Sequence, residues 1–372
     1  MGKDKNPFEA TSLAKYNPVG NAARQALVWS PEISVIAESE PLLMEIKNML
    51  DDKDISGANE RAKDVLESLK KIGKKERKIV RPFLMLISGD FKSEAGLHDD
   101  AEAMYSEAAK EAKKGGDKLM FSVAQCFLGM NMWSRGKLDD ALKYFDQAVK
   151  NNNRYVQALI NKGVALIEKD KAKKAVAEFD KALKVDMNNS LAWVNKGAAL
   201  IRIGKYKDAL TFLEMALAAN RSNALASYNK GLIMEQIKKP NDAAACYEVA
   251  FDSKDELPDN GEQLYFAWVN LMLTAVLKTI ASNDMKKADK LILDFKRLTA
   301  SAASDGVGDR IDDAIEIYKS NMNKKQKEHF SVFEYKMQTV QDAMVLWGAL
   351  RDWVSRKWPD DLTVAKVLKG AL

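Results

Sequence analysis

Apolar residues along the centre of the chain recur at spacings of three and four, the pattern of helices that bury one face. Within this pattern, a small residue is followed four positions later by a large apolar one, and then by an alanine three positions further on. The four sets are Ala141, Phe145 and Ala148; Ala175, Phe179 and Ala182; Ala209, Leu213 and Ala216; and Ala243, Tyr247 and Ala250. Successive sets follow one another with a constant 34-residue period, which predicts that one helical hairpin recurs four times over residues 122–257.

A glycine stands at one fixed place ahead of each set, at Gly129, Gly163, Gly197 and Gly231. Glycine inside a helix is about 1 kcal/mol less favourable than alanine. Such glycines are expected where a second helix packs against the backbone of the first. The large residue of each set would then fill the space between the paired helices.

These residues resemble the tetratricopeptide repeat family. Trp193, Gly197, Ala209 and Ala216 follow the family pattern within one unit, although Lys196 replaces its usual leucine. The proline that closes the family pattern is absent from all four units, where Asn153, Met187, Arg221 and Asp255 stand instead. The resemblance implies an all-α, right-handed α-solenoid of helical hairpins, with the first helix of each hairpin on the concave surface.

The flanking sequence carries weaker copies of the pattern. Ala101, Tyr105 and Ala108 repeat the signature upstream of Ala141, at a spacing longer than the regular period, and Ala288 begins a looser copy downstream. We therefore expect a flexible tail over residues 1–31, degenerate helical repeats over 32–121 and four regular units over 122–257. A degenerate helical hairpin over 258–305 and capping helices over 306–372 would complete the chain.

The C-terminal region has a different apolar pattern. Its large apolar residues follow a 3-4-3-4 spacing and share one face of a long helix: Phe330, Phe333, Met337, Val340, Met344 and Trp347. We expect this helix to cap the last repeat, which would otherwise expose its apolar face. A dimer seam or a partner-binding helix is the alternative interpretation.

Composition and motifs argue against an enzyme or a metalloprotein. The chain has 58 basic and 53 acidic residues, so its net charge of +5 is small for its length. Its two cysteines and two histidines are scattered, which predicts no disulfide framework and no metal site. No phosphate-binding glycine loop, nucleophile elbow, HExxH or CxxC motif occurs, so we expect no catalysis and no cofactor.

We expect a cytoplasmic protein that does not insert into membranes. The N-terminal segment lacks the apolar centre of a secretory signal. The longest apolar stretch, residues 266–281, contains Asn270 and Lys278 and is shorter than a bilayer-spanning helix.

An apolar stripe is expected along the first helices of the four regular units. The groove candidates combine residues of this stripe with a second ladder, of asparagines: Cys126, Met130, Trp133, Ile160, Asn161, Val164, Val194, Asn195, Ala198, Tyr228, Asn229 and Leu232. Stacked repeats would align them into a track that holds an apolar helix or an extended peptide. The alternative is that this stripe is the interface between adjacent repeats.

Asn161, Asn195 and Asn229 form the second ladder, at the same position of successive units. The family resemblance implies that such asparagines bind the backbone of a guest peptide, because an amide both donates and accepts hydrogen bonds. A bond to a neighbouring helix is the other interpretation.

The sequence thus favours a protein-interaction scaffold whose guest is a partner protein or the chain's own tail. An association with nucleic acid or the ribosome is the alternative, based on the basic run at residues 70–78 and on Arg81. The near balance of charge argues against that alternative.

Overall fold

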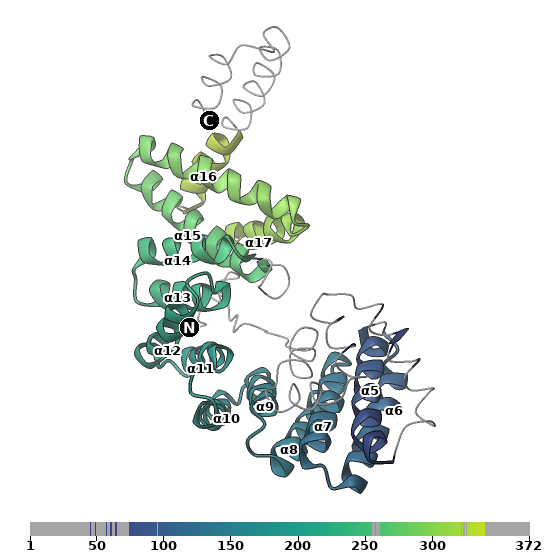
Figure 1. Ribbon diagram of the computed structural model, residues 1–372. Coiled ribbons are helices and arrows are strands. Elements are labelled where there is room, and N and C mark those ends of the chain that lie inside the picture. Colours follow the sequence, from purple (N-terminus) through teal and green to yellow (C-terminus); the bar gives the residue numbers. More distant parts are fainter. Residues whose placement is uncertain are drawn as a thin grey trace, which may run out of the picture. The chain divides into compact units, whose positions relative to one another are not determined.

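The computed structural model describes residues 74–94, 96–254, 261–320 and 326–338, together with a few isolated positions. All regular secondary structure in these ranges is helical (Figure 1), as the sequence predicts. The helices are α5 (Lys74–Glu94), α6 (His98–Gly115), α7 (Lys118–Ser134), α8 (Leu138–Asn151), α9 (Val156–Glu168), α10 (Ala172–Val185), α11 (Ser190–Arg202), α12 (Tyr206–Ala219), α13 (Ala224–Gln236), α14 (Pro240–Phe251), α15 (Glu262–Ala281), α16 (Met285–Ser304) and α17 (Gly308–Ser320).

The chain divides into two compact units, one ending at Ile233 and the other beginning at Met234. In the unit that ends at Ile233, α5 packs on α6, α7 on α8, α9 on α10 and α11 on α12. The second helix of a pair also packs on the first helix of the next pair, α6 on α7, α8 on α9 and α10 on α11. Consecutive hairpins therefore share one continuous apolar core.

The helical glycines mark the closest approach within each hairpin. A Cβ atom added to Gly129 would lie 2.5 Å from the ring of Phe145, and one added to Gly163 would lie 2.4 Å from the ring of Phe179. At Gly197, the corresponding neighbour is a terminal methyl carbon of Leu213, at 2.8 Å. The predicted contact between glycine and large residue is confirmed in these three hairpins.

The same contact extends upstream of the four regular units. A Cβ atom on Gly89 would lie 2.5 Å from the ring of Tyr105. The hairpin of α5 and α6 thus repeats the geometry of the regular units, although we expected only degenerate repeats over residues 32–121. The 34-residue period does not predict the role of Gly89, because the interval from Gly89 to Gly129 is longer than that period.

Replacing Gly163 by alanine should lower the free energy of unfolding by about 1–3 kcal/mol, because the added methyl group overpacks a closed core. This expectation runs against helix propensity, which favours alanine by about 1 kcal/mol. Gly115 is the matched control, since it ends α6 and an added Cβ atom there would meet no other atom within 4 Å. Chemical denaturation should show Gly115→Ala to be neutral or stabilising, and an equal effect of both substitutions would refute the close-approach argument.

Side-chain hydrogen bonds form the turns between repeats, where the family pattern has a proline. Asn152 accepts a hydrogen bond from the backbone N–H two residues later at 3.1 Å, and Asp186 and Asn220 do the same at 3.2 and 3.0 Å. These Asx turns recur with the 34-residue period and end the second helix of each hairpin. They stand directly before Asn153, Met187 and Arg221, the residues at the proline position.

A ladder of ion pairs joins successive repeats on their polar side. Lys162 pairs with Asp146 at 2.7 Å, Lys196 with Asp180 at 2.5 Å, and Lys230 with Glu214 at 3.1 Å. Each acid lies on the second helix of one hairpin and each lysine on the first helix of the next, so each pair links two repeats. The ladder gives Lys196 a structural role where the family pattern has leucine.

The unit that begins at Met234 has its own core, built mainly from α15, α16 and α17. Tyr265 lies at the edge of this core, where its hydroxyl donates a hydrogen bond to Asp305 and lies 2.9 Å from Ser301 Oγ. Lys254 Nζ reaches the same carboxylate at 3.1 Å. This cluster attaches the residues that follow α14 to the hairpin of α15 and α16.

The stability of that hairpin should fall in acid. The Tyr265 hydroxyl and the Lys254 ammonium lower the pKa of Asp305 below its ordinary 3.8, against a smaller opposing effect of burial. A lowered pKa in the folded state means that the stabilisation is present above the ordinary pKa and is lost as the pH falls through the lowered one. The protection factors of the α15 and α16 amides, which are corrected for the intrinsic exchange rate at each pH, should therefore fall below about pH 4. Asp305→Asn should reduce that fall, and an unchanged profile would contradict the assignment.

The start of the C-terminal helix caps this core. Phe330 and Phe333 are buried, and the Phe333 ring lies edge-on to Phe295 with a centroid separation of 5.3 Å. Met337 is half-buried against the same cluster. The remaining stripe residues, Val340, Met344 and Trp347, lie outside the described residues, as do residues 1–31.

One helix among the described residues, α15, is long and apolar enough over Leu264–Ala281 to cross a membrane, with a mean hydropathy of 1.5. Its buried face, which includes Val269, Leu273 and Val276, belongs to the core with α16. This burial gives the apolar character of α15 a role in the fold.

Candidate functional site

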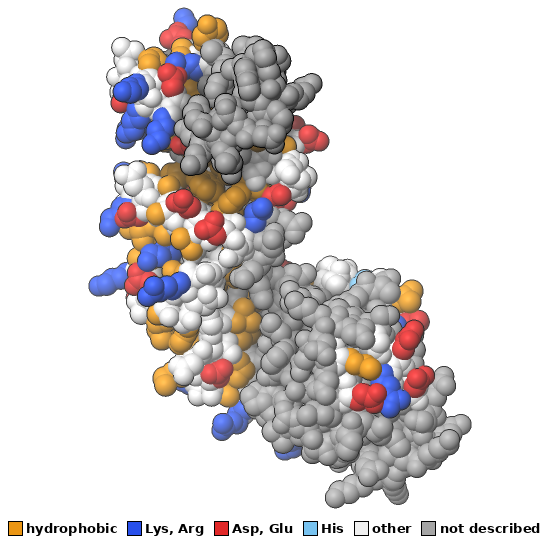
Figure 2. Space-filling view, turned by 45° about the horizontal axis from the view of Figure 1, so that its top comes forward, with side chains coloured by type: hydrophobic (Ala, Val, Ile, Leu, Met, Phe, Trp, Pro, Cys, Tyr) orange, Lys and Arg blue, Asp and Glu red, His pale blue; other side chains and the backbone are white. Residues whose placement is uncertain are grey.

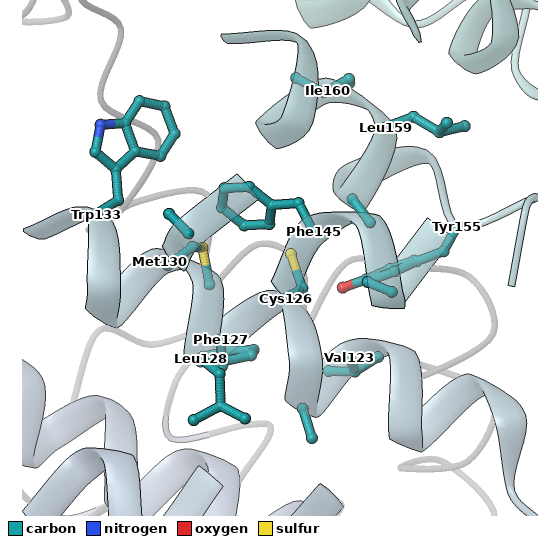
Figure 3. Close-up of a cluster of buried hydrophobic side chains, with 14 of the residues drawn as sticks. Val123, Cys126, Phe127, Leu128, Met130, Trp133, Phe145, Tyr155, Leu159 and Ile160 are labelled. Atoms are coloured by element: carbon teal, nitrogen blue, oxygen red, sulfur yellow. The ribbon is translucent and has the colours of Figure 1, made fainter. Parts of the chain in front are cut away.

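The twelve candidate residues, here named the inner stripe, lie on the first helices of four successive hairpins. Three come from each of α7, α9, α11 and α13, and each set of three shares one helical face. All twelve belong to the unit that ends at Ile233. Figure 3 shows Cys126, Met130 and Trp133 following one another along α7.

Eleven of the twelve side chains are buried, and Leu232 is half-buried. Cys126, Ile160 and Asn161 have no exposed surface. This burial fits the alternative interpretation of the stripe, as an interface between adjacent repeats. Their role in binding a peptide stays a prediction.

Asn161 is held by neighbours within the protein. Its Nδ2 donates a hydrogen bond to Cys126 Sγ at 3.3 Å, and its Oδ1 accepts one from Gln157 at 3.1 Å. Burial raises the pKa of the Cys126 thiol to about 12, with the Asn161 bond as a smaller opposing influence, so the thiol is neutral. For Cys126 and Asn161, these contacts show packing between adjacent repeats.

Asn195 and Asn229 differ from Asn161, although the repeat makes the three equivalent. Asn195 is 1% exposed and Asn229 is fully buried. Asn195 Nδ2 and both polar atoms of the Asn229 amide have no hydrogen-bond partner among the described residues. Burying an unpaired polar group costs about 1–3 kcal/mol, so buried amides are almost always hydrogen-bonded to protein or to ordered water.

The repeat explains why two amides are unpaired and one is not. At the place that Cys126 occupies relative to Asn161, the later units carry Ile160 relative to Asn195 and Val194 relative to Asn229. Neither aliphatic side chain accepts a hydrogen bond. Gln157 is likewise replaced one and two repeats later by leucine, at positions 191 and 225. The loss of these polar neighbours fits the unpaired Nδ2 of Asn195 and the unpaired Nδ2 and Oδ1 of Asn229.

Charged groups beside the inner stripe are paired with one another. Trp133 Nε1 donates to Glu168 at 2.7 Å, and Arg202 contacts Asp170 at 3.0 Å. Burial lowers the pKa of Arg202, and Asp170 counteracts this effect. Together with the ion-pair ladder, these contacts leave the stripe without a strong net charge.

The family described as the tetratricopeptide repeat protein 21 C-terminal ARM domain matches residues 100–280. This range includes the helices whose glycine, alanine and aromatic residues recur with the 34-residue period. The repeats within residues 100–280 are tetratricopeptide-like.

Several solved repeat proteins resemble part of this chain. MamA is 19% identical with a TM-score of 0.39, and the match covers 45% of this chain and 95% of MamA. YrrB, described as a TPR protein with an unusual peptide-binding site, is 17% identical with a TM-score of 0.40, covering 51% of this chain and 94% of YrrB. MamA from Desulfovibrio magneticus RS-1 is 26% identical with a TM-score of 0.39, covering 50% of this chain and 97% of that protein. No curated protein matches the sequence.

Within the described part of this repeat protein, no group of three or more His, Cys, Asp and Glu side chains is arranged to hold a metal ion. Both cysteines are free thiols, Cys126 buried and Cys246 half-buried.

The alternative based on basic residues has little support from the described contacts. Arg81 contacts both Glu107 and Glu111 of α6, so its charge serves the packing of α5 on α6. Basic and acidic side chains are interspersed on the face shown in Figure 2. Residues 70–73 of the basic run lie outside the described residues, and nucleic-acid binding stays a prediction.

Sequence reasoning missed the ion-pair ladder and the role of Gln157. The ladder has a clear signal, because an acid precedes each lysine at the same spacing in three successive repeats. The sequence indicates the role of Gln157 less clearly. It becomes visible only when Gln157 is compared with Leu191 and Leu225, the residues at the same place beside Asn195 and Asn229.

Proposed function

We propose that the protein is a non-enzymatic scaffold that holds a segment of another polypeptide along the inner stripe. The observation that carries this proposal is that Asn195 Nδ2 and both polar atoms of the Asn229 amide are buried without a hydrogen-bond partner among mostly apolar side chains. We also propose a reducing, cytoplasmic setting, which suits the two free thiols.

The chemistry of an amide suits a polypeptide backbone. Asn229 offers both a donor and an acceptor, and Asn195 offers at least its Nδ2 donor. An extended chain presents alternating N–H and C=O groups, whereas a helix has already paired its own along its length. The guest is therefore an extended segment that bonds through its backbone.

The residues around the two amides determine which kinds of side chain the guest can carry. Val194, Ala198 and Tyr228 are apolar neighbours in sequence on the same helical faces. A charged side chain placed there would lose its hydration without gaining an opposite charge, which is costly. The proposed guest is therefore uncharged over the residues that contact the stripe.

Peptide display offers a direct test of this function. A library of random linear peptides is selected against the full-length chain, and the enriched peptides are tested against a variant in which Asn195 and Asn229 are both alanine. The proposal predicts uncharged peptides that bind the parent chain and lose affinity for the variant. Lys173→Ala is the control, because Lys173 is exposed on α10. Peptides that bind both chains equally would place the binding surface elsewhere.

A further inference from the structure

We propose that one edge of the repeat stack, here named the basic edge, holds the protein against the surface of a bilayer that contains anionic lipids. The basic edge comprises the turns that join one hairpin to the next, with the helix ends beside them: residues 113–118, 150–155, 184–189 and 220–223. This inference goes beyond the proposed function, because it concerns a surface separate from the inner stripe.

The topology brings these turns together. In the unit that ends at Ile233, consecutive helices are joined by short turns and pack on each other. Helices connected in this way run antiparallel, so the turns alternate between two edges of the stack. The turns within hairpins, such as that between α7 and α8, lie at one edge. The turns between hairpins, such as that between α8 and α9, lie at the other.

The basic edge carries an excess of positive charge. Its segments contain two acidic residues, Asp117 and Asp186, which accept hydrogen bonds from the backbone N–H groups of Met120 and Asn188. They also contain seven basic residues, all exposed: Lys113, Lys114, Lys118, Lys150, Arg154, Lys184 and Arg221. None of the seven forms an ion pair with another residue in the part of the chain that the structure describes.

The opposite edge is close to charge balance. The turns within hairpins, residues 97–100, 134–140, 168–174 and 202–208, contain nine basic and seven acidic residues. Ion pairs join these turns from one hairpin to the next. Arg135 pairs with Asp99 at 3.0 Å, and Arg202 pairs with Asp170 at 3.0 Å. Only the basic edge therefore presents unpaired positive charge with few acidic residues nearby.

An exposed apolar side chain accompanies these charges. Met187 stands in the turn between α10 and α11 and is 71% exposed, more than any other large apolar side chain described in this unit. Lys184 lies three residues before it in the same turn segment. Cations that attract anionic headgroups, beside an apolar group that enters the boundary between headgroups and acyl chains, suit the surface of a bilayer.

A bilayer fits this edge better than a nucleic acid does. Binding of single strands relies on exposed aromatic side chains that stack on the bases. Tyr155 is only 3% exposed, and Phe121 is half-buried with Lys113 Nζ 6.0 Å from its ring centroid. Helices pack 8–10 Å apart, so the cations of successive hairpins lie about 20 Å from one another. Lipids diffuse to each separate group of cations, whereas the phosphates of a duplex form a dense, fixed row.

Vesicle flotation tests the proposal on the full-length chain. Vesicles of phosphatidylcholine mixed with phosphatidylserine should bind the chain at low salt, and vesicles of phosphatidylcholine alone should not. Raising the salt to about 1 M, where the screening length is about 3 Å, should release the protein. Absence of binding to the anionic vesicles at low salt would overturn the proposal.

Two variants with the same loss of charge test the location of the surface. The edge variant lacks four cations of the basic edge: Lys114→Ala, Lys150→Ala, Arg154→Ala and Lys184→Ala. The control lacks four exposed lysines of the opposite edge: Lys137→Ala, Lys171→Ala, Lys174→Ala and Lys205→Ala. Each cation near an anionic surface strengthens binding roughly fivefold, so the edge variant should bind at least about 30-fold more weakly and the control within about threefold of the parent chain. Equal losses would mean that net charge alone acts, and would overturn the proposal.

Met187→Ser separates a bilayer from other polyanions. It should weaken vesicle binding about three- to tenfold, because the apolar contact with lipid is lost, and should leave the binding of polyuridylic acid and polyglutamate unchanged. If Met187→Ser leaves vesicle binding unchanged while the edge variant loses these polymers, the basic edge binds another polyanion and the proposal is wrong. Such a failure leaves the proposed function untouched, because Asn195 and Asn229 are present in every variant.

Discussion

Replacing Phe179 by alanine should lower the free energy of unfolding by about 3–5 kcal/mol. The ring has no exposed surface, and it lies against the backbone of Gly163 in the paired helix. No side chain at Gly163 can move in to fill the space that the ring leaves. Because each hairpin is stabilised by its neighbours, the loss should spread to the adjacent repeats.

Lys173→Ala serves as the control, since Lys173 is exposed on the same helix and should change the stability by less than about 0.5 kcal/mol. Urea denaturation followed by far-ultraviolet circular dichroism measures both variants. A loss below about 1 kcal/mol for Phe179→Ala would contradict a core built on contacts between glycine and large residue.

Removing the amides of Asn195 and Asn229 together should weaken the binding of a display-selected peptide by roughly 30- to 700-fold. The reason is that the bound backbone would lose its partners at both positions, at about 1–2 kcal/mol for each. Fluorescence anisotropy with the labelled peptide measures the change.

Asn161→Ala is the informative comparison, because Asn161 is already bonded to Gln157 and Cys126. It should leave the peptide affinity within about threefold, well below the loss of one hydrogen bond to a buried amide. Equal losses from all three asparagines would indicate a uniform ladder, and no loss from any of them would exclude backbone binding by these amides.

The local pairing of helices could be predicted because it depends on residue size at a fixed spacing. The contacts of Gly129 with Phe145 and of Gly163 with Phe179 can be predicted from residues within one hairpin, without knowledge of distant parts of the chain. The hairpin of α5 and α6 was underestimated because the extra residues after Ala108 shift Gly89 out of the 34-residue period. The replacement of the closing proline was missed, because Asn152 and Asp186 achieve the turn through side-chain hydrogen bonds instead.

The candidate site could be placed on the correct helical faces, but its burial could not be predicted. Periodicity identifies an apolar face without stating what covers it, so Ile160 and Val164 suit a groove and a repeat interface equally well. The difference between Asn161 and Asn229 depends on which residue of the preceding repeat lies against each asparagine. Only the stacked arrangement of hairpins brings Cys126 into contact with Asn161.

The most direct measurement is the response of the asparagine side chains to a bound peptide. In a chain labelled with ¹⁵N at asparagine, the Nδ2 resonances of Asn195 and Asn229 are recorded while a display-selected peptide is added to saturation. Backbone binding along the inner stripe predicts that both resonances shift, while that of Asn153, exposed between α8 and α9, stays in place. Saturation of the protein with no change at Asn195 and Asn229 would contradict the account.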